Sequence, residues 1–313
     1  MSTYCYPIIA GPTASGKTAV AVALAQRLGG EVVSADSMQI YDGVRVGTAR
    51  PTDEEMQGVP HHLQGFLPIQ EKYSVARYVE DAHAVFLDIF ERGKMPILCG
   101  GTGLYIQSFM ENRTLLPHPT DEAYRERLRN EIAAHGGEHL LEQLRAVDPK
   151  TAARLHPNDH QRIIRALEIY HVSGMTISQQ DELSHSTPSP YNGCLFVLNF
   201  RDRQALYDRI NQRVDGRVRD GILDETQYML QVDRQATALQ AIGYKELIPY
   251  LAGDCVLSEA IEKLKMETRR YAKRQLSWFR RMDDAVMIYV DDYANLDALV
   301  DDLTRRYHEF CRG

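Results

Sequence analysis

The N-terminal third of the chain alternates between short apolar runs and longer segments whose apolar positions recur at helical intervals. Apolar and β-branched residues fill positions 4–10, 31–35 and 95–99, which predicts three strands. Residues 17–28 and 73–92 lie between these runs and have the spacing of amphipathic helices. This strand–helix–strand order predicts a parallel sheet that is covered by helices.

The middle of the chain has a different pattern. No strand pattern occurs from about residue 115 to 191, whereas proline and glycine separate three helical segments at 121–135, 138–147 and 158–173. Strand patterns return at 194–200 and 286–290, around helical segments at 203–221, 224–232 and 258–281. We therefore predict an α/β core domain of residues 1–114 and 194–313, with a helical insertion domain at 115–193.

A glycine-rich turn follows the first predicted strand and opens the first predicted helix. It matches the pattern G-x-x-x-x-G-K-[ST] in full, with the residues Gly11, Pro12, Thr13, Ala14, Ser15, Gly16, Lys17 and Thr18. In this context the backbone N–H groups form an anion nest, Lys17 adds a positive charge, and the Thr18 hydroxyl can bind Mg²⁺. The sequence thus predicts a phosphate site on a P-loop NTPase-like sheet, and the motif alone favours ATP or GTP.

The acidic residue expected beside such a site is not where nucleotide hydrolases have it. The third strand ends in Cys99-Gly100-Gly101, without an aspartate. The nearest candidate is Asp36, which follows the second strand. Because the carboxyl ends of parallel strands face one crevice, Asp36 should lie beside the phosphate site. There it could bind a metal ion indirectly or take a proton from a nucleophile, and the alternative is a cap on the turn.

Composition narrows the class of protein. Of 313 residues, 44% are hydrophobic and 25% are charged, as in ordinary globular proteins. No apolar run is long enough for a membrane span, and no basic leader precedes the first strand, so we expect no membrane association. The five cysteines form no CxxC pair, which favours a reducing, cytoplasmic location.

The net charge of −7 argues weakly against nucleic acid, but the charges are segregated. Between residues 263 and 281 the basic residues are Lys263, Lys265, Arg269, Arg270, Lys273, Arg274, Arg280 and Arg281, with Glu267 as the single acid. An acidic tail follows. A basic strip on an acidic body is typical of local phosphate contact, and a solvated helix face is the alternative.

Several short sequence blocks, in a fixed order along the chain, are more specific than the P-loop alone. They are residues 11–18, 34–41 (Ser-Ala-Asp-Ser-Met-Gln-Ile-Tyr), 47–51, 60–63, 100–105, 158–168, 241–246 (Ala-Ile-Gly-Tyr-Lys-Glu) and 268–280 (Thr-Arg-Arg-Tyr-Ala-Lys-Arg-Gln-Leu-Ser-Trp-Phe-Arg). Together they resemble the tRNA dimethylallyltransferase (tRNA isopentenyltransferase) family of bacterial type. The blocks keep the family's order from Gly11 to Arg280, nearly the whole chain.

The resemblance implies a reaction. A dimethylallyl group would pass from dimethylallyl diphosphate to N6 of the adenosine just 3′ of the anticodon, in tRNAs that read codons beginning with U, with release of diphosphate. Mg²⁺ is the implied cofactor. The P-loop would then hold the donor's diphosphate rather than a nucleotide, and the protein's partner would be the anticodon stem-loop of tRNA.

The chemistry needs leaving-group stabilisation, proton removal and exclusion of water. The resemblance implies Asp36 as the general base and Thr102 as a contact to the target base or the donor, although Thr102 could also belong to a plain turn. It further implies an arginine on helix 203–221 for the diphosphate. Arg213 matches best, and Arg209 is the neighbouring candidate.

The residues predicted to contact tRNA come from five of these blocks. They are Asp36, Ser37, Met38, Gln39, Thr102, Gln161, Arg162, Ile163, Ile164, Arg165, Gly243, Tyr244, Lys245, Arg269, Arg270, Lys273 and Arg274. Gln39 suits an adenine edge. Trp278 and Phe279 are expected in the core, and the pair His61-His62 in a structural role, because adjacent side chains point apart.

The chain departs from the family pattern at two positions, and two other functions are compatible with its motifs. Where the family has a basic and then an acidic residue, this chain has Asp42 and Arg45, which leaves room for a local ion pair. A P-loop kinase of small metabolites, with Asp36 as base toward an alcohol, is one alternative function. The other is a non-catalytic tRNA-binding NTPase switch. A monomer is the default expectation.

Overall fold

The computed structural model describes residues 4–113, 119–184, 188–234 and 236–312. The chain divides into two compact units, which are considered separately below. Unit 1 is Met1–Met110 with Pro190–Gly313, and unit 2 is Glu111–Ser189. The sequence pattern set the corresponding limits at residues 115 and 193.

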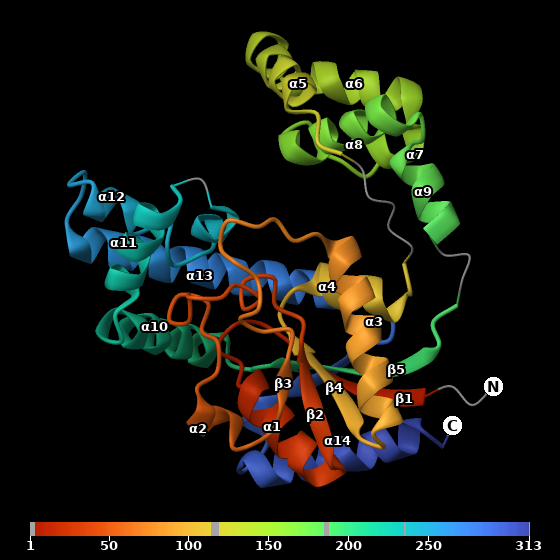
Figure 1. Ribbon diagram of the computed structural model, residues 1–313, viewed down its shortest axis with the longest axis vertical. Helices are drawn as coiled ribbons and strands as arrows, with labels where there is room; N and C mark the ends of the chain where they lie inside the picture. Colours follow the sequence, from red (N-terminus) through yellow and green to blue (C-terminus); the bar gives the residue numbers. More distant parts are fainter. Residues whose placement is uncertain (1–3, 114–118, 185–187, 235, 313) are drawn as a thin grey trace. The chain divides into compact units, whose positions relative to one another are not determined.

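A six-stranded parallel sheet forms the centre of unit 1 (Figure 1). Its strands are β1 (Tyr4–Ala10), β2 (Gly30–Ser34), β3 (His61–His62), β4 (Met95–Gly100), β5 (Tyr191–Asn199) and β6 (Val286–Tyr289), in the order β3-β2-β4-β1-β5-β6. The central strand β1 pairs with both β4 and β5, and Ile9 lies opposite Cys99 on one side and Phe196 on the other. The P-loop therefore leaves the middle of the sheet.

Helices cover both faces of this sheet. The helices of unit 1 are α1 (Lys17–Leu28), α2 (Asp53–Met56), α3 (Val75–Glu91), α4 (Gly103–Met110), α10 (Arg203–Arg219), α11 (Ile222–Val232), α12 (Ile248–Leu251), α13 (Leu257–Phe279) and α14 (Leu296–Phe310), with 3-10 turns at Thr237–Gln240 and Val290–Asp292. One core packs α3 and α4 on the sheet, and a second packs α1 and α14 on the other face. Since β1 leads to α1 and β4 to α4, the chain leaves these neighbouring strands toward opposite faces. Such a switch point is where ligands bind in open α/β sheets.

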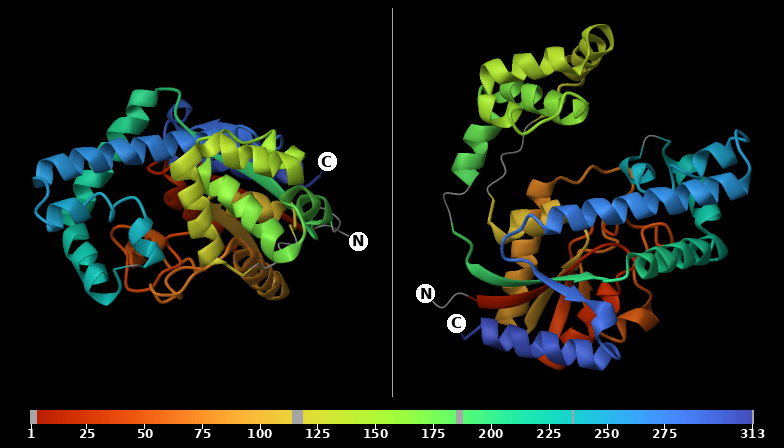
Figure 2. Two further views of the ribbon diagram at one scale, coloured as in Figure 1. Left: turned by 90° about the horizontal axis from the view of Figure 1, so that it is seen from above. Right: turned by 180° about the vertical axis from the view of Figure 1, so that it is seen from behind.

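A third core lies beside the sheet and supports the remaining helices. It joins residues of the 38–69 segment, such as Tyr41 and Val44, to Ile222 and Met229 of α11 and to Tyr244. The long helix α13 packs against α10 and crosses above the sheet (Figure 2). In this way, segments distant in sequence are brought to the carboxyl ends of the strands.

Unit 2 is entirely helical in its described part. It contains α5 (Glu122–His135), α6 (Gly137–Val147), α7 (Pro149–Ala152), α8 (His160–Ser173) and α9 (Ile177–Ser184). Leucine and isoleucine side chains from α5, α6 and α8 form its core. Glu168 is fully buried there, and Arg125 and Arg165 neutralise its charge at 2.8 and 2.5 Å. These ion pairs satisfy the one acidic side chain that α8 buries.

The predicted strands and long helices are found, with ends shifted by a few residues, but some helices were missed. The largest is α14, within a tail that the sequence analysis described only as acidic. Leu299, Leu303 and Tyr307 recur every four residues and are buried against α1, while acids such as Asp301 face solvent. None of the helices in the described ranges is long and apolar enough to cross a membrane.

Glu31 ties the edge of the sheet together. Its carboxylate on β2 accepts hydrogen bonds from Arg92, at the end of α3, at 2.5 and 2.8 Å and lies 2.7 Å from Nε2 of His62 on β3. The residue is only 6% exposed. Hydrogen bonds from Arg92, and then from His62, lower the pKa of Glu31 to about 2 against the opposing effect of burial.

Replacing Glu31 with glutamine should therefore destabilise the protein in a pH-dependent way. A carboxyl whose pKa is lowered by folding stabilises the native state fully above its unfolded pKa and loses that contribution as pH falls toward its folded pKa. We expect Glu31→Gln to lower the free energy of unfolding by roughly 1–3 kcal/mol at neutral pH. In denaturant titrations this difference should shrink from about pH 5 to about pH 3. Glu91→Gln, at an exposed neighbouring acid, is the control; equal pH dependence of both variants would contradict the assignment.

Candidate functional site

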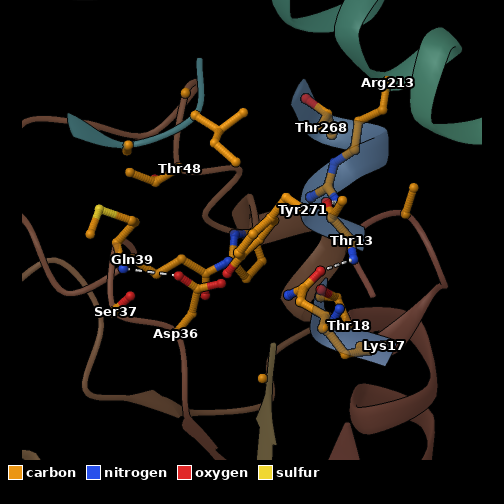
Figure 3. Close-up of a pocket in the computed structure, with 18 of the residues that line it drawn as sticks. Thr13, Lys17, Thr18, Asp36, Ser37, Gln39, Thr48, Arg213, Thr268 and Tyr271 are labelled. Atoms are coloured by element: carbon orange, nitrogen blue, oxygen red, sulfur yellow. Dashed lines mark hydrogen bonds between the residues drawn. The ribbon is translucent and has the colours of Figure 1, made fainter. Parts of the chain in front are cut away.

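A cavity of about 750 Å³ opens at the carboxyl ends of the central strands. Its walls come from the P-loop, the Asp36–Gln39 turn, the loop at Gly47–Thr48 and helices α10 and α13. In Figure 3, Asp36 lies on the side of the cavity opposite Lys17 and Thr18, and the ring of Tyr271 reaches between them. The carboxylate of Asp36 therefore lies across the cavity from the P-loop. The sequence predicted that these two elements would lie side by side.

The P-loop has the backbone of an anion nest. Gly11, Ala14 and Gly16 all have positive φ, at 142°, 64° and 90°. A Cβ atom on Gly11 would lie 2.6 Å from the carbonyl oxygen of Leu198, so only glycine fits there. Mixed right- and left-handed residues before a helix N-terminus turn successive N–H groups toward a bound anion.

Lys17 stands at the start of α1 and faces the cavity. Its Nζ donates to the carbonyl oxygen of Pro12 at 2.7 Å. The pKa of Lys17 is lowered to about 8, mainly by burial and also by Arg213, while Cys99 and Asp36 act in the opposite direction. A buried ammonium with a lowered pKa gains most from an arriving anion.

Two arginines of α10 reach the P-loop. Arg213 Nη1 donates to Thr13 Oγ1 at 3.0 Å, and Arg209 Nε donates to the carbonyl oxygen of Ala14 at 3.0 Å. Burial lowers the pKa of Arg213, whereas Arg209 is exposed. Both sequence candidates thus lie at the phosphate loop, and Arg213 is the more deeply placed of the two.

Gln275 joins the P-loop to the turn after β4. Its Oε1 accepts from the backbone N–H of Thr13 at 2.9 Å, and its Nε2 donates to the carbonyl oxygen of Gly101 at 2.9 Å. The residue is 6% exposed, and a Cβ on Gly101 would lie 2.2 Å from Nε2. Gln275 lies within one block of the resemblance, but no role was predicted for it, because its partners are 262 and 174 positions away in the chain.

Asp36 follows β2, where it caps a turn and also lines the cavity. Its Oδ1 accepts from the backbone N–H of Met38 at 2.9 Å, which caps the turn, and the side chain also lines the cavity. Thr102 supports this turn, because its Oγ1 accepts from the backbone N–H of Ser37 at 3.0 Å. Thr102 is not among the residues that line the cavity in the described structure, so its contact with a substrate stays a prediction.

The Gln39 amide is engaged within the protein. Its Nε2 donates to the carbonyl oxygen of Ala49 at 3.1 Å, and its Oε1 accepts from Ser34 and Gln64. Ser37, Met38 and Gln39 all line the cavity, so the structure brings this predicted block together. Recognition of a base by Gln39 would require it to exchange these bonds.

Glu225, which the sequence analysis did not single out, holds the loop on the far wall. Its carboxylate accepts from the backbone N–H groups of Arg45, Val46 and Gly47 at 2.8–2.9 Å, and from the hydroxyl of Tyr244. The Tyr244 ring fills the space where a Cβ of Gly47 would lie. Tyr244 is 0% exposed, so its predicted contact with tRNA is corrected to a packing role.

The remaining basic candidates of unit 1 differ in exposure. Lys245 and Arg274 are exposed and line the cavity, and Lys273 is exposed on the same helix as Arg274. Arg269 donates to Asn211 Oδ1 at 2.6 Å, and Arg270 pairs with Glu267 at 2.6 Å. The backbone N–H of Gly243 donates to Glu246, which leaves Lys245 as the exposed member of its block.

The candidates of unit 2 lie on α8. Gln161 and Arg162 are exposed near its N-terminus, and Arg165 is bound to the buried Glu168. Ile163 and Ile164 are 0% and 7% exposed, because both pack in the core of this unit. Their predicted side-chain contact with tRNA is therefore corrected, whereas Gln161 and Arg162 remain available.

Other sequence expectations concern metals and ion pairs. The described residues contain no cluster of three or more His, Cys, Asp or Glu side chains suited to a metal ion. His61 and His62 lie on β3 and bond to Val59 and Glu31, a structural role as expected. Asp42 and Arg45 form no ion pair with each other in the described part of the chain; Arg45 lies near Asp53 and Arg50 near Asp42.

Fold and site together define an α/β protein of the P-loop class, with the P-loop and a carboxylate lining one cavity. Comparison with known proteins agrees. A family model described as IPP transferase matches residues 39–282, and one described as isopentenyl transferase matches residues 5–63. The chain belongs to this family of tRNA dimethylallyltransferases.

Relatives and solved structures extend the match over the chain. A tRNA dimethylallyltransferase of Thermoanaerobacter sp. (strain X514) is 46% identical over 295 residues, which cover 93% of this chain and 94% of that protein. One of Geobacillus thermodenitrificans is 48% identical and covers 87% and 86%.

The full-length tRNA isopentenylpyrophosphate transferase of Bacillus halodurans has a TM-score of 0.71 at 40% identity, covering 98% and 97%. A eukaryotic dimethylallyltransferase acting on tRNA has a TM-score of 0.75 at 28% identity, covering 96% and 78%. The predicted fold class and family are thereby confirmed.

The lowered pKa of Lys17 predicts how phosphate binding depends on pH. Below about pH 8 the Lys17 side chain is protonated and can bind an anion directly. Above this pH it is mostly neutral, so anion binding requires that Lys17 first takes up a proton. We therefore compare the affinity for inorganic diphosphate, measured by calorimetry, in the wild type and in Lys17→Met. Above pH 8 the ratio of the wild-type affinity to the variant affinity should fall by up to about tenfold per pH unit. The comparison with the variant removes the titration of diphosphate itself. Lys94→Met, at an exposed lysine just before β4, is the control, and parallel pH profiles for wild type and Lys17→Met would contradict the assignment.

Proposed function

We propose that this protein transfers a dimethylallyl group from dimethylallyl diphosphate to N6 of the adenosine 3′ of the anticodon, in tRNAs that read codons beginning with U. The observation that supports this most is one cavity with an anion nest on one side and Asp36 on the other. The names of the relatives support the same reaction class. As tRNA is the substrate, we place the protein in the cytoplasm, and we propose that it acts as a monomer.

The leaving group of this reaction is diphosphate. The nest, Lys17 and Arg213 lie where charge develops on the bridging and terminal oxygens as the allylic C–O bond breaks. Backbone donors and two buried cations that are in place before the donor arrives need little rearrangement during the reaction. The P-loop would thus serve a diphosphate ester in the way that it serves a nucleotide in other proteins.

The nucleophile is an exocyclic amine whose lone pair is conjugated with the adenine ring. It must lose a proton as the new C–N bond forms, and a carboxylate within reach can accept it. Asp36 uses Oδ1 for the Met38 N–H, while Oδ2 has no hydrogen-bond partner among the described residues. Oδ2 is therefore the proposed proton acceptor, and the capped turn would hold it in place.

Mg²⁺ fits this site in the manner of phosphate-bound magnesium. The ion prefers oxygen ligands and binds through one or two protein groups together with substrate phosphates. The Thr18 hydroxyl and Asp36 line the same cavity and would hold it with the donor's diphosphate. When bound, the ion would add positive charge to the leaving group.

The acceptor adenosine must leave its stack to reach a donor inside a cavity. Tyr271 lines the cavity and offers an aromatic face, with the Arg274 guanidinium 5.7 Å from the ring centroid. Lys245 and Arg274 are exposed at the cavity and can approach the tRNA backbone. Phosphate contacts of this kind position an RNA without selecting its sequence.

The whole proposal is tested by mass analysis of tRNA after incubation with the protein and dimethylallyl diphosphate. The expected product is N6-dimethylallyladenosine in the anticodon loop. ATP turnover with a small-molecule acceptor, and no prenylated nucleoside, would favour the kinase alternative instead.

Replacing Asp36 with asparagine should remove the base while keeping the turn, since the amide oxygen can still accept from Met38. We expect turnover to fall by about 10²–10⁴-fold with tRNA affinity nearly unchanged. Single-turnover prenylation and filter binding measure the two effects separately. Asp42→Asn, at an exposed acid outside the cavity, should leave both unchanged. A comparable loss of tRNA affinity in Asp36→Asn would assign Asp36 to binding rather than to proton transfer.

Lys273→Gln should weaken tRNA binding and reduce its salt dependence. Lys273 is exposed on α13, next to Arg274 at the cavity. Losing one phosphate contact lowers the slope of log K against log salt by about 1. Lys94→Gln carries the same charge change on the surface before β4 and serves as control. An unchanged salt slope for Lys273→Gln would show instead that α13 presents an ordinary solvated face.

A further inference from the structure

Three arginines follow one face of α10 toward the cavity. Arg209, Arg213 and Arg217 recur every four residues and all line it. Residues at this spacing lie about 6 Å apart along a helix axis. The first two bond to the P-loop, as described above. Arg217 comes one turn further along the helix.

Arg217 has no partner within the described residues. Its Nε has no exposed surface and no hydrogen-bond acceptor, and no carboxylate lies within ion-pair distance of its guanidinium in that part of the chain. The pKa of Arg217 is lowered to about 9, mainly by burial and also by the neighbouring Arg213. Arg217 is partly buried, and a cation withdrawn from water without a counterion is costly, so its position points to something that binds it.

Neither acid near Arg217 forms an ion pair with it in the described part of the chain. Glu225 uses its carboxylate for three backbone N–H groups and the Tyr244 hydroxyl, so it can turn toward Arg217 only by releasing the loop at Gly47. Asp36 caps its own turn through Oδ1. The missing counterion of Arg217 is therefore expected from a ligand rather than from the protein.

We propose that Arg217 is a phosphate-binding residue, which pairs with a phosphate oxygen that a substrate carries into the cavity. This inference rests on the proposed function, in which two substrates bring phosphate: the donor diphosphate and the tRNA backbone. The nest, Lys17 and Arg213 already serve the diphosphate. Arg217 lies one turn beyond Arg213 on α10, and its charge is influenced by Tyr244 and by Glu225 of α11. A phosphodiester beside the flipped adenosine is the source that this position favours.

The test compares Arg217→Met, which removes the charge but keeps an apolar stem, with Arg217→Lys, which keeps the charge. Three quantities are measured for each: the Kd for tRNA at several salt concentrations, the Kd for inorganic diphosphate, and the KM and kcat of prenylation. Arg217→Met should weaken tRNA binding about tenfold and lower its salt slope by about 1. Diphosphate affinity should change less than about twofold, and Arg217→Lys should recover the salt slope.

The control is Arg219→Met, at an exposed arginine two residues further on that does not line the cavity. If Arg217→Met weakens diphosphate instead of tRNA, the phosphate partner is the donor and the residue keeps its role. Unchanged affinities for both ligands, with a higher melting temperature, would overturn the proposal and show an unpaired structural charge. If Arg217→Met does not fold, Arg217→Gln against Arg217→Lys gives the same comparison.

The two binding measurements need no transfer of the prenyl group. Failure of the wild type to form N6-dimethylallyladenosine would therefore overturn the proposed function and leave the phosphate assignment of Arg217 to be decided by binding alone. Conversely, normal prenylation by wild type and equal behaviour of Arg217→Met and Arg219→Met would remove only the role of Arg217.

Discussion

The structure depends on positive charge that is buried at the carboxyl ends of the sheet before any anion is present. Burial is the main cause that lowers the pKa values of Lys17, Arg213 and Arg217. Among the residues that line the cavity with them, the carboxylates are those of Asp36 and Glu55. Such an arrangement is unfavourable by itself and becomes favourable when a ligand with several negative charges enters. The cavity therefore favours ligands that carry phosphate, and the backbone N–H groups of the P-loop determine how such a ligand is oriented.

Two anchors that bond to backbone groups keep this arrangement in place. Gln275 ties the P-loop to the turn after β4, and the Glu225 carboxylate, neutralised by backbone dipoles, holds the loop at Gly47. Both anchors belong to the helices beside the sheet, so α11 and α13 shape the cavity as much as the strands do. Because each anchor bonds to backbone groups, it fixes the position of a cavity wall.

The sequence predicted those parts of the fold and site whose determinants are local. α1 spans Lys17–Leu28 as predicted, since the P-loop motif and Gly29 mark its two ends. Asp36 and Arg213 were placed by motif and resemblance, and both line the cavity. The anchors could not be predicted, because Gln275 and Thr13 are 262 positions apart and Glu225 and Arg45 are 180 apart. α14 did carry a local signal, in Leu299, Leu303 and Tyr307, which the acidic composition obscured.

Some residues that were predicted to contact RNA are buried in the structure, because a sequence block does not show which of its side chains face solvent. A sequence block marks a stretch of chain, but a helix turns neighbouring residues to different sides. In α8, Arg162 faces solvent while Ile163 and Ile164 pack inside, so one block supplies both surface and core. In α10, by contrast, helical geometry brings residues together: the four-residue spacing places Arg209, Arg213 and Arg217 on one side of the helix. Helical phase, rather than membership of a block, therefore decides which basic residues of this protein can meet a phosphate.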